Sequence, residues 1–256
     1  MSFVISVVAV APIRKEASHR SEMVSELLLG EYAELLVETK DFYKIKCLYD
    51  GYEGWCQRVQ LAVVDEIKPT NLYLSKAISI AKINGRDCRI SCGTPIYATD
   101  SVVSFGNNYQ VQFPSKYAIS NNEMEWNSFN IEFIAHQYIN TPYLWGGKSV
   151  FGIDCSGFTQ QVFKLFNIHL LRDAYQQAEM GEVIGFLQEV QCGDLAFFDN
   201  EEGIITHVGI LLNSNTIIHA SGKVRIDKID TLGIINSDTG ERTHTLRLIK
   251  RIVRKV

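Results

Sequence analysis

An excess of basic residues is missing from this sequence of 256 residues. Lysine and arginine together number 25, against 29 aspartates and glutamates, so the formal net charge is −4. Proteins that bind nucleic acid usually carry a basic surface, and nucleic acid is therefore not an expected partner.

Long apolar runs are also missing. The apolar stretch at the N-terminus, "MSFVISVVAVAP", extends over about ten residues, whereas a membrane-spanning helix needs about twenty. The same stretch lacks the positive segment and the cleavage site of a signal peptide. We interpret it as a buried strand and expect a cytoplasmic protein that does not associate with membranes.

Cysteine occurs at only six positions, too few for a scaffold held together by disulfides. A chain of this length with 46% apolar residues can bury a core without such bonds, so we expect reduced thiols. Cys88 and Cys92 are close in sequence, but no second cysteine or histidine pair stands near them at zinc-site spacing. We interpret both as buried apolar residues and predict no metal or other cofactor.

Short strands and tight turns characterise the first 64 residues. "EMVSELLLGEYAELLVET" contains two strands separated at Gly30-Glu31, and "FYKIKCLYDGYEGWCQ" alternates in polarity around a turn signal at Asp50-Gly51. This pattern predicts a small β-barrel. Residues 65–120 repeat the pattern more weakly, either as a second small β module or as an extension of the first, followed by a linker to residue 128.

The pattern changes at Phe129. "FNIEFIAHQYIN" has helical spacing and ends just before a proline. Further along, residues recur at intervals of three, four and four, which predicts one amphipathic helix with these residues on its apolar face: Cys155, Phe158, Val162 and Phe166. Strand-like segments follow to the C-terminus. A helical group followed by a run of strands predicts an α+β domain over residues 129–256.

Cys155 stands at the first turn of the predicted helix, directly after Asp154, which is a good N-cap residue. Unpaired N–H groups and the helix dipole lower the pKa of a thiol in this position and favour the thiolate. The backbone N–H of Cys155 would also serve an oxyanion hole, and Gly157 would let a substrate approach the helix. The alternative is a core cysteine on the apolar face, and spacing alone does not decide between the two.

Two histidines in strand-like segments are candidates for the base that a nucleophilic cysteine needs: His207 in "ITHVGILL" and His219 in "TIIHASG". If the loop between them is the three residues "NSN", Leu212 lies opposite Thr216. Gly209 then lies opposite His219, and the two imidazoles become diagonal neighbours on one face. This would complete a Cys-His-His triad; the alternative is two unrelated structural histidines. The remaining histidines are expected to be peripheral: His19, His136, His169 and His244.

Five segments, taken in order, resemble the NlpC/P60 family of cysteine peptidases: "PYLWGGKSVFGIDCSGF", "RDAYQQAEMG", "CGDLAFF", "HVGILL" and "IIHASG". The resemblance covers residues 129–256 and implies a papain-like catalytic fold. "EMVSELLLGE" and "DGYEGW" resemble the bacterial SH3 domain that precedes this catalytic domain in γ-D-glutamyl-L-diamino acid endopeptidases of the dipeptidyl-peptidase VI type.

The resemblance also implies roles for individual residues. Cys155 would be the nucleophile, His207 the base and His219 the orienting third residue, with Tyr143 near the thiol. Asp154, beside Ser156, would bind the free amine of an N-terminal L-Ala, and Glu53 of the SH3 domain would complete the amine pocket. Other interpretations remain: Asp154 as an N-cap whose charge opposes the thiolate, Glu53 as an exposed hairpin residue, and Arg172 and Asp173 as loop-shaping residues or a surface pair.

The activity implied is hydrolysis of the bond between γ-D-glutamate and the diamino acid in short murein peptides, as in recycling of cell-wall peptides. The expected partner is such a peptide, and we expect a monomer. Alternatives are an amidase or acyltransferase on the same scaffold, a secreted murein hydrolase that binds the wall, and an inactive scaffold. The complete Cys-His-His set argues against the last.

Overall fold

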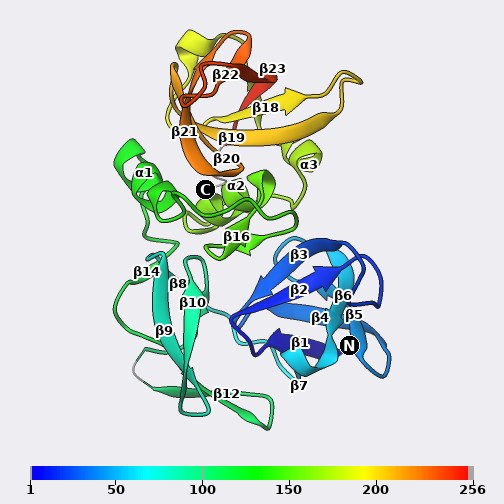
Figure 1. Cartoon of the computed structure of the whole chain (residues 1–256). Coiled ribbons are helices and arrows are strands. Elements are labelled where there is room, and N and C mark those ends of the chain that lie inside the picture. Colours follow the sequence, from blue (N-terminus) through cyan, green and yellow to red (C-terminus); the bar gives the residue numbers. More distant parts are fainter. Residues whose placement is uncertain (1, 100, 253–256) are drawn as a thin grey trace. The chain divides into compact units, whose positions relative to one another are not determined.

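The computed structural model describes residues 2–99 and 101–252, and the chain divides into two units (Figure 1). The N-terminal unit comprises Met1–Met124 and Leu144–Gly152, and the C-terminal unit comprises Glu125–Tyr143 and Ile153–Val256. The C-terminal unit thus starts earlier than the predicted residue 129, and it lacks a segment that the sequence placed within it. None of the described helices is long and apolar enough to cross a membrane.

Residues 2–64 contain one antiparallel sheet with strand order β3-β2-β6-β5-β4-β1-β7. The two strands predicted on either side of Gly30 are β3 and β4, and Gly30 itself has φ of +81°. A Cβ atom there would lie 2.9 Å from Cε2 of Tyr97, so the turn accepts only glycine. The elements are β1 (Ser2–Ser6), β2 (Val10–Arg14), β3 (Met23–Leu28), β4 (Tyr32–Glu38), β5 (Phe42–Cys47), β6 (Glu53–Gln57), the 3-10 helix η1 (Arg58–Gln60) and β7 (Leu61–Val64).

Residues 65–120 have sheets of their own: a four-stranded sheet of order β10-β9-β13-β12 and a three-stranded sheet of order β11-β8-β14. Their core is continuous with that of the first sheet, because Ile5 and Leu29 cluster with Ile90 and Phe113. The strands are β8 (Leu72–Leu74), β9 (Ile78–Ile83), β10 (Arg86–Ser91), β11 (Pro95–Ile96), β12 (Val102–Phe105), β13 (Tyr109–Gln112) and β14 (Ala118–Ser120).

The segment Leu144–Gly152 belongs to the N-terminal unit because its polar groups are paired there. The backbone N–H of Lys148 donates to Glu26 Oε2 at 2.7 Å, and the buried Lys148 ammonium lies 3.8 Å from Glu31. The indole N–H of Trp145 donates to Glu22 at 2.8 Å. Such partners are not visible as a sequence pattern, so the predicted boundaries did not separate this segment from the rest of residues 129–256. The segment contains β15 (Lys148–Ser149) and the start of β16 (Gly152–Ile153).

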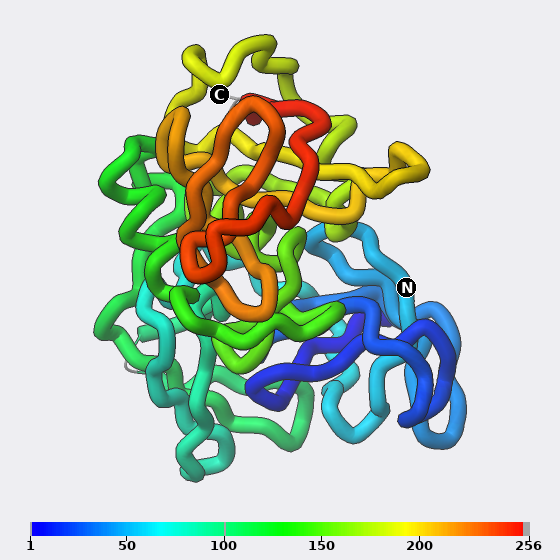
Figure 2. The backbone as a smooth tube through the Cα atoms, turned by 45° about the horizontal axis from the view of Figure 1, so that its top comes forward, coloured from blue at the N-terminus to red at the C-terminus, as the bar shows by residue number. Residues whose placement is uncertain are grey.

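The C-terminal unit is built on an antiparallel sheet of order β17-β23-β18-β19-β20-β21-β22. Because β22 also pairs with β23, the sheet closes into a barrel, drawn in yellow to red in Figures 1 and 2. Its apolar core includes Phe198, Leu211, Ile217 and Ile229. The strands are β17 (Glu182–Ile184), β18 (Leu195–Asp199), β19 (Ile205–Asn213), β20 (Thr216–Ser221), β21 (Lys223–Asp230), β22 (Gly233–Ile235) and β23 (Arg242–Arg251).

Helix α2 (Cys155–Lys164) packs on β19 and β20 and begins at the predicted cysteine. The helix was expected to expose a polar face, but all ten of its residues are buried. The reason is that neighbouring segments cover the polar side chains: Thr159 donates to Gln177 at 2.7 Å, and Gln160 donates to the carbonyl of Leu170 at 3.0 Å. The other helices of this unit are α1 (Ser128–His136), α3 (Ala174–Ala178) and the 3-10 helix η2 (Leu187–Glu189).

Candidate active site

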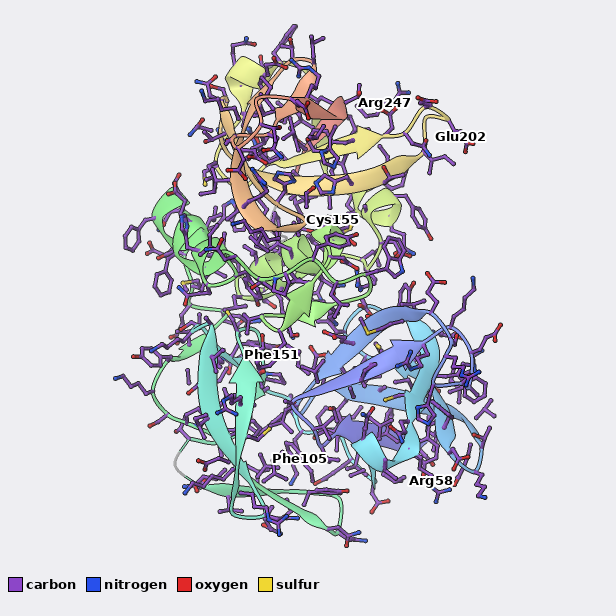
Figure 3. The ribbon with its side chains drawn as sticks, in the orientation of Figure 1. Arg58, Phe105, Phe151, Cys155, Glu202 and Arg247 are labelled. Carbon is purple, nitrogen blue, oxygen red and sulfur yellow. The ribbon has the colours of Figure 1, made fainter. Side chains whose placement is uncertain are left out.

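Cys155 is the first residue of α2, and its side chain is buried (Figure 3). Asp154 caps the helix, with Oδ1 accepting a hydrogen bond from the N–H of Gly157 at 2.7 Å. The sulfur lies 4.0 Å from the carbonyl oxygen of Thr206, and the backbone of Val208 is also within its hydrogen-bonding range. These two residues flank His207, so the helix start meets the stretch of β19 that carries the proposed base.

The thiol of Cys155 is protonated in the resting structure. Burial and then the charge of Asp154 raise its pKa to about 12, although the backbones of Val208 and Ser156 and the charge of Arg172 act in the opposite direction. The lowered pKa predicted from the helix dipole alone is therefore wrong, because desolvation outweighs the dipole. Burial, with His219 and His244 nearby, lowers the pKa of His207, so the imidazole is neutral. Thiol and imidazole thus face the reaction as an uncharged pair.

His207 and His219 are hydrogen-bonded to each other, with Nε2 of His207 2.8 Å from Nδ1 of His219. The strands β19 and β20 pair Gly209 with His219, as predicted, which makes the two histidines diagonal neighbours. The loop differs from the prediction. Asn213 rather than Leu212 lies opposite Thr216, and a bulge before Asn213 restores the register.

Asp227 extends this contact into a line of three hydrogen-bonded side chains, and its part in the site was not predicted from the sequence. Its Oδ2 lies 3.0 Å from Nε2 of His219, and both residues are fully buried. Arg225 is the direct partner of His219 across β20 and β21, so Asp227 is the diagonal neighbour. The alternation in "VRID" places Arg225 and Asp227 on the same face of β21. It predicts that Asp227 lies near His219 only if the register of the β20–β21 hairpin is known.

His244, expected to be peripheral, is part of the site. Its ring stacks on that of His207 with centroids 4.2 Å apart and 27° between the planes. The ring of Phe198 lies against both, with its centroid 5.7 Å from that of His207 and 5.8 Å from that of His244. Burial and His219 lower the pKa of His244 to about 4, although Asp227 acts in the opposite direction. The expectation was wrong because β23 pairs with β18 across a long sequence separation, which local pattern does not reveal.

Tyr143 is half-buried and forms a parallel bridge with Ile153, just before the nucleophile. Burial, followed by the charges of Cys155 and Asp154, raises the pKa of its hydroxyl. The phenol therefore lies within electrostatic range of the thiol and stays protonated, so it can donate a hydrogen bond.

Asp154 and Ser156 are both held by Arg172, whose side chain is 1% exposed. Its Nη1 and Nη2 donate to the two oxygens of Asp154 at 3.0 and 2.6 Å, and Nη1 also donates to Ser156 Oγ at 3.1 Å. The interpretation of Arg172 as a surface residue is wrong. The charge of Asp154 is balanced inside the protein rather than only by a substrate.

Glu53 lies in the N-terminal unit, at the start of β6. Its side chain is half-exposed and forms an ion pair with Lys44 at 3.2 Å. Lys44 pairs with Trp55 and Lys46 pairs with Glu53 across the β5–β6 hairpin. Within its own unit, Glu53 is therefore an accessible hairpin residue.

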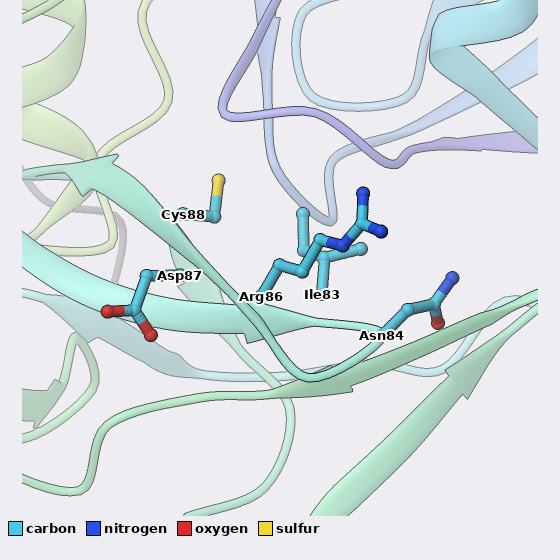
Figure 4. Close-up of a pocket in the computed structure, with 5 residues that line it drawn as sticks. All are labelled: Ile83, Asn84, Arg86, Asp87 and Cys88. Atoms are coloured by element: carbon cyan, nitrogen blue, oxygen red, sulfur yellow. The ribbon is translucent and has the colours of Figure 1, made fainter.

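The two other cysteines singled out from the sequence differ from each other. Cys92 is buried, as predicted, whereas Cys88 is partly exposed and lines a surface pocket with Ile83, Asn84, Arg86 and Asp87 (Figure 4). The pocket belongs to the β9–β10 hairpin of the N-terminal unit. Neither cysteine forms a disulfide.

A cysteine at a helix start, set against two neighbouring barrel strands that each carry one histidine of a hydrogen-bonded pair, defines a thiol hydrolase of papain-like architecture. The family follows from two matches along the chain. Residues 140–242 match the NlpC/P60 family, and residues 13–61 match the bacterial dipeptidyl-peptidase Sh3 domain. The chain belongs to the NlpC/P60 cysteine peptidases and carries a bacterial SH3 domain ahead of the peptidase domain, which confirms the predicted family and fold class.

Several curated relatives are similar in sequence to most of this chain. The γ-D-glutamyl-L-lysine dipeptidyl-peptidase of Bacillus subtilis is 30% identical over 75% of this chain and 66% of its own length. The dipeptidyl-peptidase 6 of Lysinibacillus sphaericus is 27% identical over 88% of this chain and 91% of its own length. This chain thus spans about two thirds of the first relative.

Solved structures agree on the fold. The crystal structure of an NlpC/P60 family protein from Bacillus cereus superimposes with a TM-score of 0.82 over 98% of this chain and 100% of that chain, at 20% identity. An NlpC/P60 endopeptidase from Photobacterium damselae gives a TM-score of 0.74 over 96% of this chain and 70% of that chain, at 17% identity.

Proposed function

We propose that this peptidase hydrolyses the bond between γ-D-glutamate and a diamino acid in short murein peptides that have a free N-terminal L-Ala. The names of its Bacillus and Lysinibacillus relatives support this substrate class, since a dipeptidyl-peptidase releases a dipeptide from a free N-terminus. The match of the N-terminal region to the SH3 domain of such enzymes supports it as well.

The chemistry of the proposal starts with Cys155 and His207. His207 takes the thiol proton while the sulfur attacks the γ-D-glutamyl carbonyl, and a tetrahedral oxyanion forms. The backbone N–H of Cys155 and the hydroxyl of Tyr143 are the proposed donors to that oxyanion. The amine of the diamino acid then leaves with the proton from His207. Water, deprotonated by His207, cleaves the thioester and releases L-Ala-γ-D-Glu and the free thiol.

Recognition of the free amine is assigned to Asp154, Ser156 and Glu53. An N-blocked peptide offers no ammonium to these polar groups, so we expect selectivity for peptides with a free amine. Arg172 complicates a test at Asp154, because replacing that carboxylate also breaks a buried ion pair. Glu53 is the cleaner position, since it is accessible and its contact with Lys44 is a surface pair.

The test is digestion of L-Ala-γ-D-Glu-L-Lys and of the corresponding diaminopimelate peptide, followed by mass spectrometry. The expected products are L-Ala-γ-D-Glu and the free diamino acid, and N-acetylated peptides should react far more slowly. Cys155→Ala should give no product. Equal cleavage of acetylated and free peptides would reject the amine pocket, and activity that survives Cys155→Ala would reject the nucleophile.

A further inference from the structure

Asp227 lies at the inner end of a line of hydrogen bonds that begins at His207. The line passes from His207 Nε2 to His219 Nδ1 at 2.8 Å, and from His219 Nε2 to Asp227 Oδ2 at 3.0 Å. The three residues come from the neighbouring strands β19, β20 and β21. All three side chains are buried, so water does not compete for these contacts.

The carboxylate of Asp227 is ionised and locked in place. Burial raises its pKa, but hydrogen bonds from His219, the backbone N–H of Ser237 and Arg225 outweigh burial and hold the pKa well below its usual range. Ser237 N and Arg225 Nη2 both donate to Oδ1, at 2.8 and 3.0 Å, and Arg225 Nε lies 2.8 Å from Oδ2. The oxygen that faces His219 can therefore only accept a hydrogen bond.

This acceptor determines the protonation of both rings. Nε2 of His219 must carry a hydrogen, and in a neutral imidazole Nδ1 is then an acceptor. Nε2 of His207 must in turn donate to it. His207 is neutral because its pKa is lowered by burial, so its remaining nitrogen, Nδ1, holds a lone pair.

We propose that Asp227 is a positioning residue that fixes the tautomers of His219 and His207 and so leaves Nδ1 of His207 as the proton acceptor for Cys155. The inference rests on the proposed roles of Cys155 and His207. Two neutral imidazoles in contact can donate a hydrogen bond in either direction, so the histidines alone do not fix their tautomers. Asp227 on β21 fixes that direction.

The substitution Asp227→Asn should reverse the line of hydrogen bonds. Two donors converge on the Oδ1 position, so the amide oxygen belongs there and the amide NH2 faces His219. Nε2 of His219 would then accept, Nδ1 of His219 would donate to His207, and Nδ1 of His207 would carry the hydrogen. A ring protonated there cannot take the proton of Cys155.

The primary experiment is nitrogen-15 NMR of the histidine side chains in the full chain, which reports tautomers without any substrate. Both His207 and His219 should be Nε2–H tautomers in the wild type and Nδ1–H tautomers in Asp227→Asn. Alkylation of Cys155 by iodoacetamide should slow in the variant. With a cleavable peptide, kcat should fall by about 10³-fold with little change in KM, as expected for a wrong tautomer of a catalytic base.

Asp194→Asn is the matched control. Asp194 is also a buried carboxylate in the C-terminal unit, paired with Arg251 at 2.7 Å and accepting from the backbone N–H of Gln191 at 2.8 Å. Its substitution should lower stability in a similar way but leave the tautomers and kcat unchanged. Asp227→Glu, which keeps an anionic acceptor, should retain the Nε2–H tautomers and recover part of kcat.

Each outcome decides the matter. Unchanged tautomers with unchanged kcat in Asp227→Asn would overturn the proposal. If that variant does not fold, the wild-type spectrum decides instead, and an Nδ1–H tautomer at His207 or a doubly protonated His219 would overturn it. Failure to cleave any murein peptide would reject the proposed function, whereas the tautomers and the alkylation rate test the positioning role independently.

Discussion

Near the site, the C-terminal unit has a buried aspartate paired with an arginine on each side, Asp154 on the helix side of Cys155 and Asp227 on the barrel side. Asp154 adjoins the nucleophile, and its charge raises the pKa of the thiol. Asp227 is separated from His207 by one imidazole and is hydrogen-bonded to that imidazole rather than to His207 itself. Two aspartate–arginine pairs of the same kind thus affect different groups: the first acts on the pKa of the thiol, and the second contacts the histidine that is hydrogen-bonded to His207.

The largest expected effect comes from breaking the helix-side pair. Arg172→Met removes the partner of a buried carboxylate and should cost about 3–5 kcal/mol in the free energy of unfolding. It should also raise the pKa of Cys155 further, because the charge of Arg172 lowers that pKa. Urea unfolding and the pH dependence of alkylation measure the two effects. A variant as stable as the wild type would show that Asp154 gains water or another partner.

The two aspartates should give opposite signs in one assay. Asp154→Asn removes the charge that raises the pKa of Cys155, so alkylation at neutral pH should speed up. The thiolate fraction rises about tenfold for each unit by which the pKa falls. Asp227→Asn should slow the same reaction. Equal effects of both substitutions would mean that burial of charge, rather than its position, controls the thiol.

A pH effect on stability should come from His207 and His244. Both have pKa values below the ordinary value near 6.5, so between those values and about 6.5 the unfolded chain binds more protons than the folded one. Stability should therefore fall as pH drops from about 6.5 toward 4, by up to about 2.7 kcal/mol per pH unit for two groups.

His244→Phe keeps a ring against His207 but removes one titrating group, so it should halve the slope of stability against pH. Urea unfolding at several pH values between 4.5 and 7.5 checks this. Parallel curves for variant and wild type would show that His244 is protonated equally in both states.

The smallest effect on stability is expected at Glu53. Its half-exposed ion pair with Lys44 contributes about 0–1 kcal/mol, so Glu53→Gln should barely change unfolding. It should nevertheless lower kcat/KM for peptides with a free amine and leave the low rate on acetylated peptides unchanged. Thr39→Ala, at a surface turn of the same unit, is a suitable control. Equal loss on both kinds of peptide would remove Glu53 from amine recognition.

The sequence was sufficient for local features of the site. Helical spacing located the start of α2 at Cys155, and strand alternation placed His207 and His219 together. The predicted three-residue loop was wrong in detail, yet the bulge before Asn213 preserved the pairing of Gly209 with His219. A small error of register was absorbed because the hairpin is stabilised by its buried face.

The remaining features depend on contacts that no local pattern encodes. His244 reaches His207 through the pairing of β18 with β23, and Arg172 follows no periodic segment that would predict its burial. The pKa of Cys155 was mispredicted for the same reason. The helix dipole can be read from position, whereas desolvation depends on everything packed around the sulfur.

The closed barrel has one further consequence for the peptidase. His207, His219 and Asp227 lie on the adjacent strands β19, β20 and β21, and neighbouring strands joined by backbone hydrogen bonds are about 4.8 Å apart. The distances between the three side chains are thus set by the spacing of the strands rather than by the conformation of loops. A different polar side chain at position 219 could therefore link His207 to Asp227 by hydrogen bonds without any movement of His207.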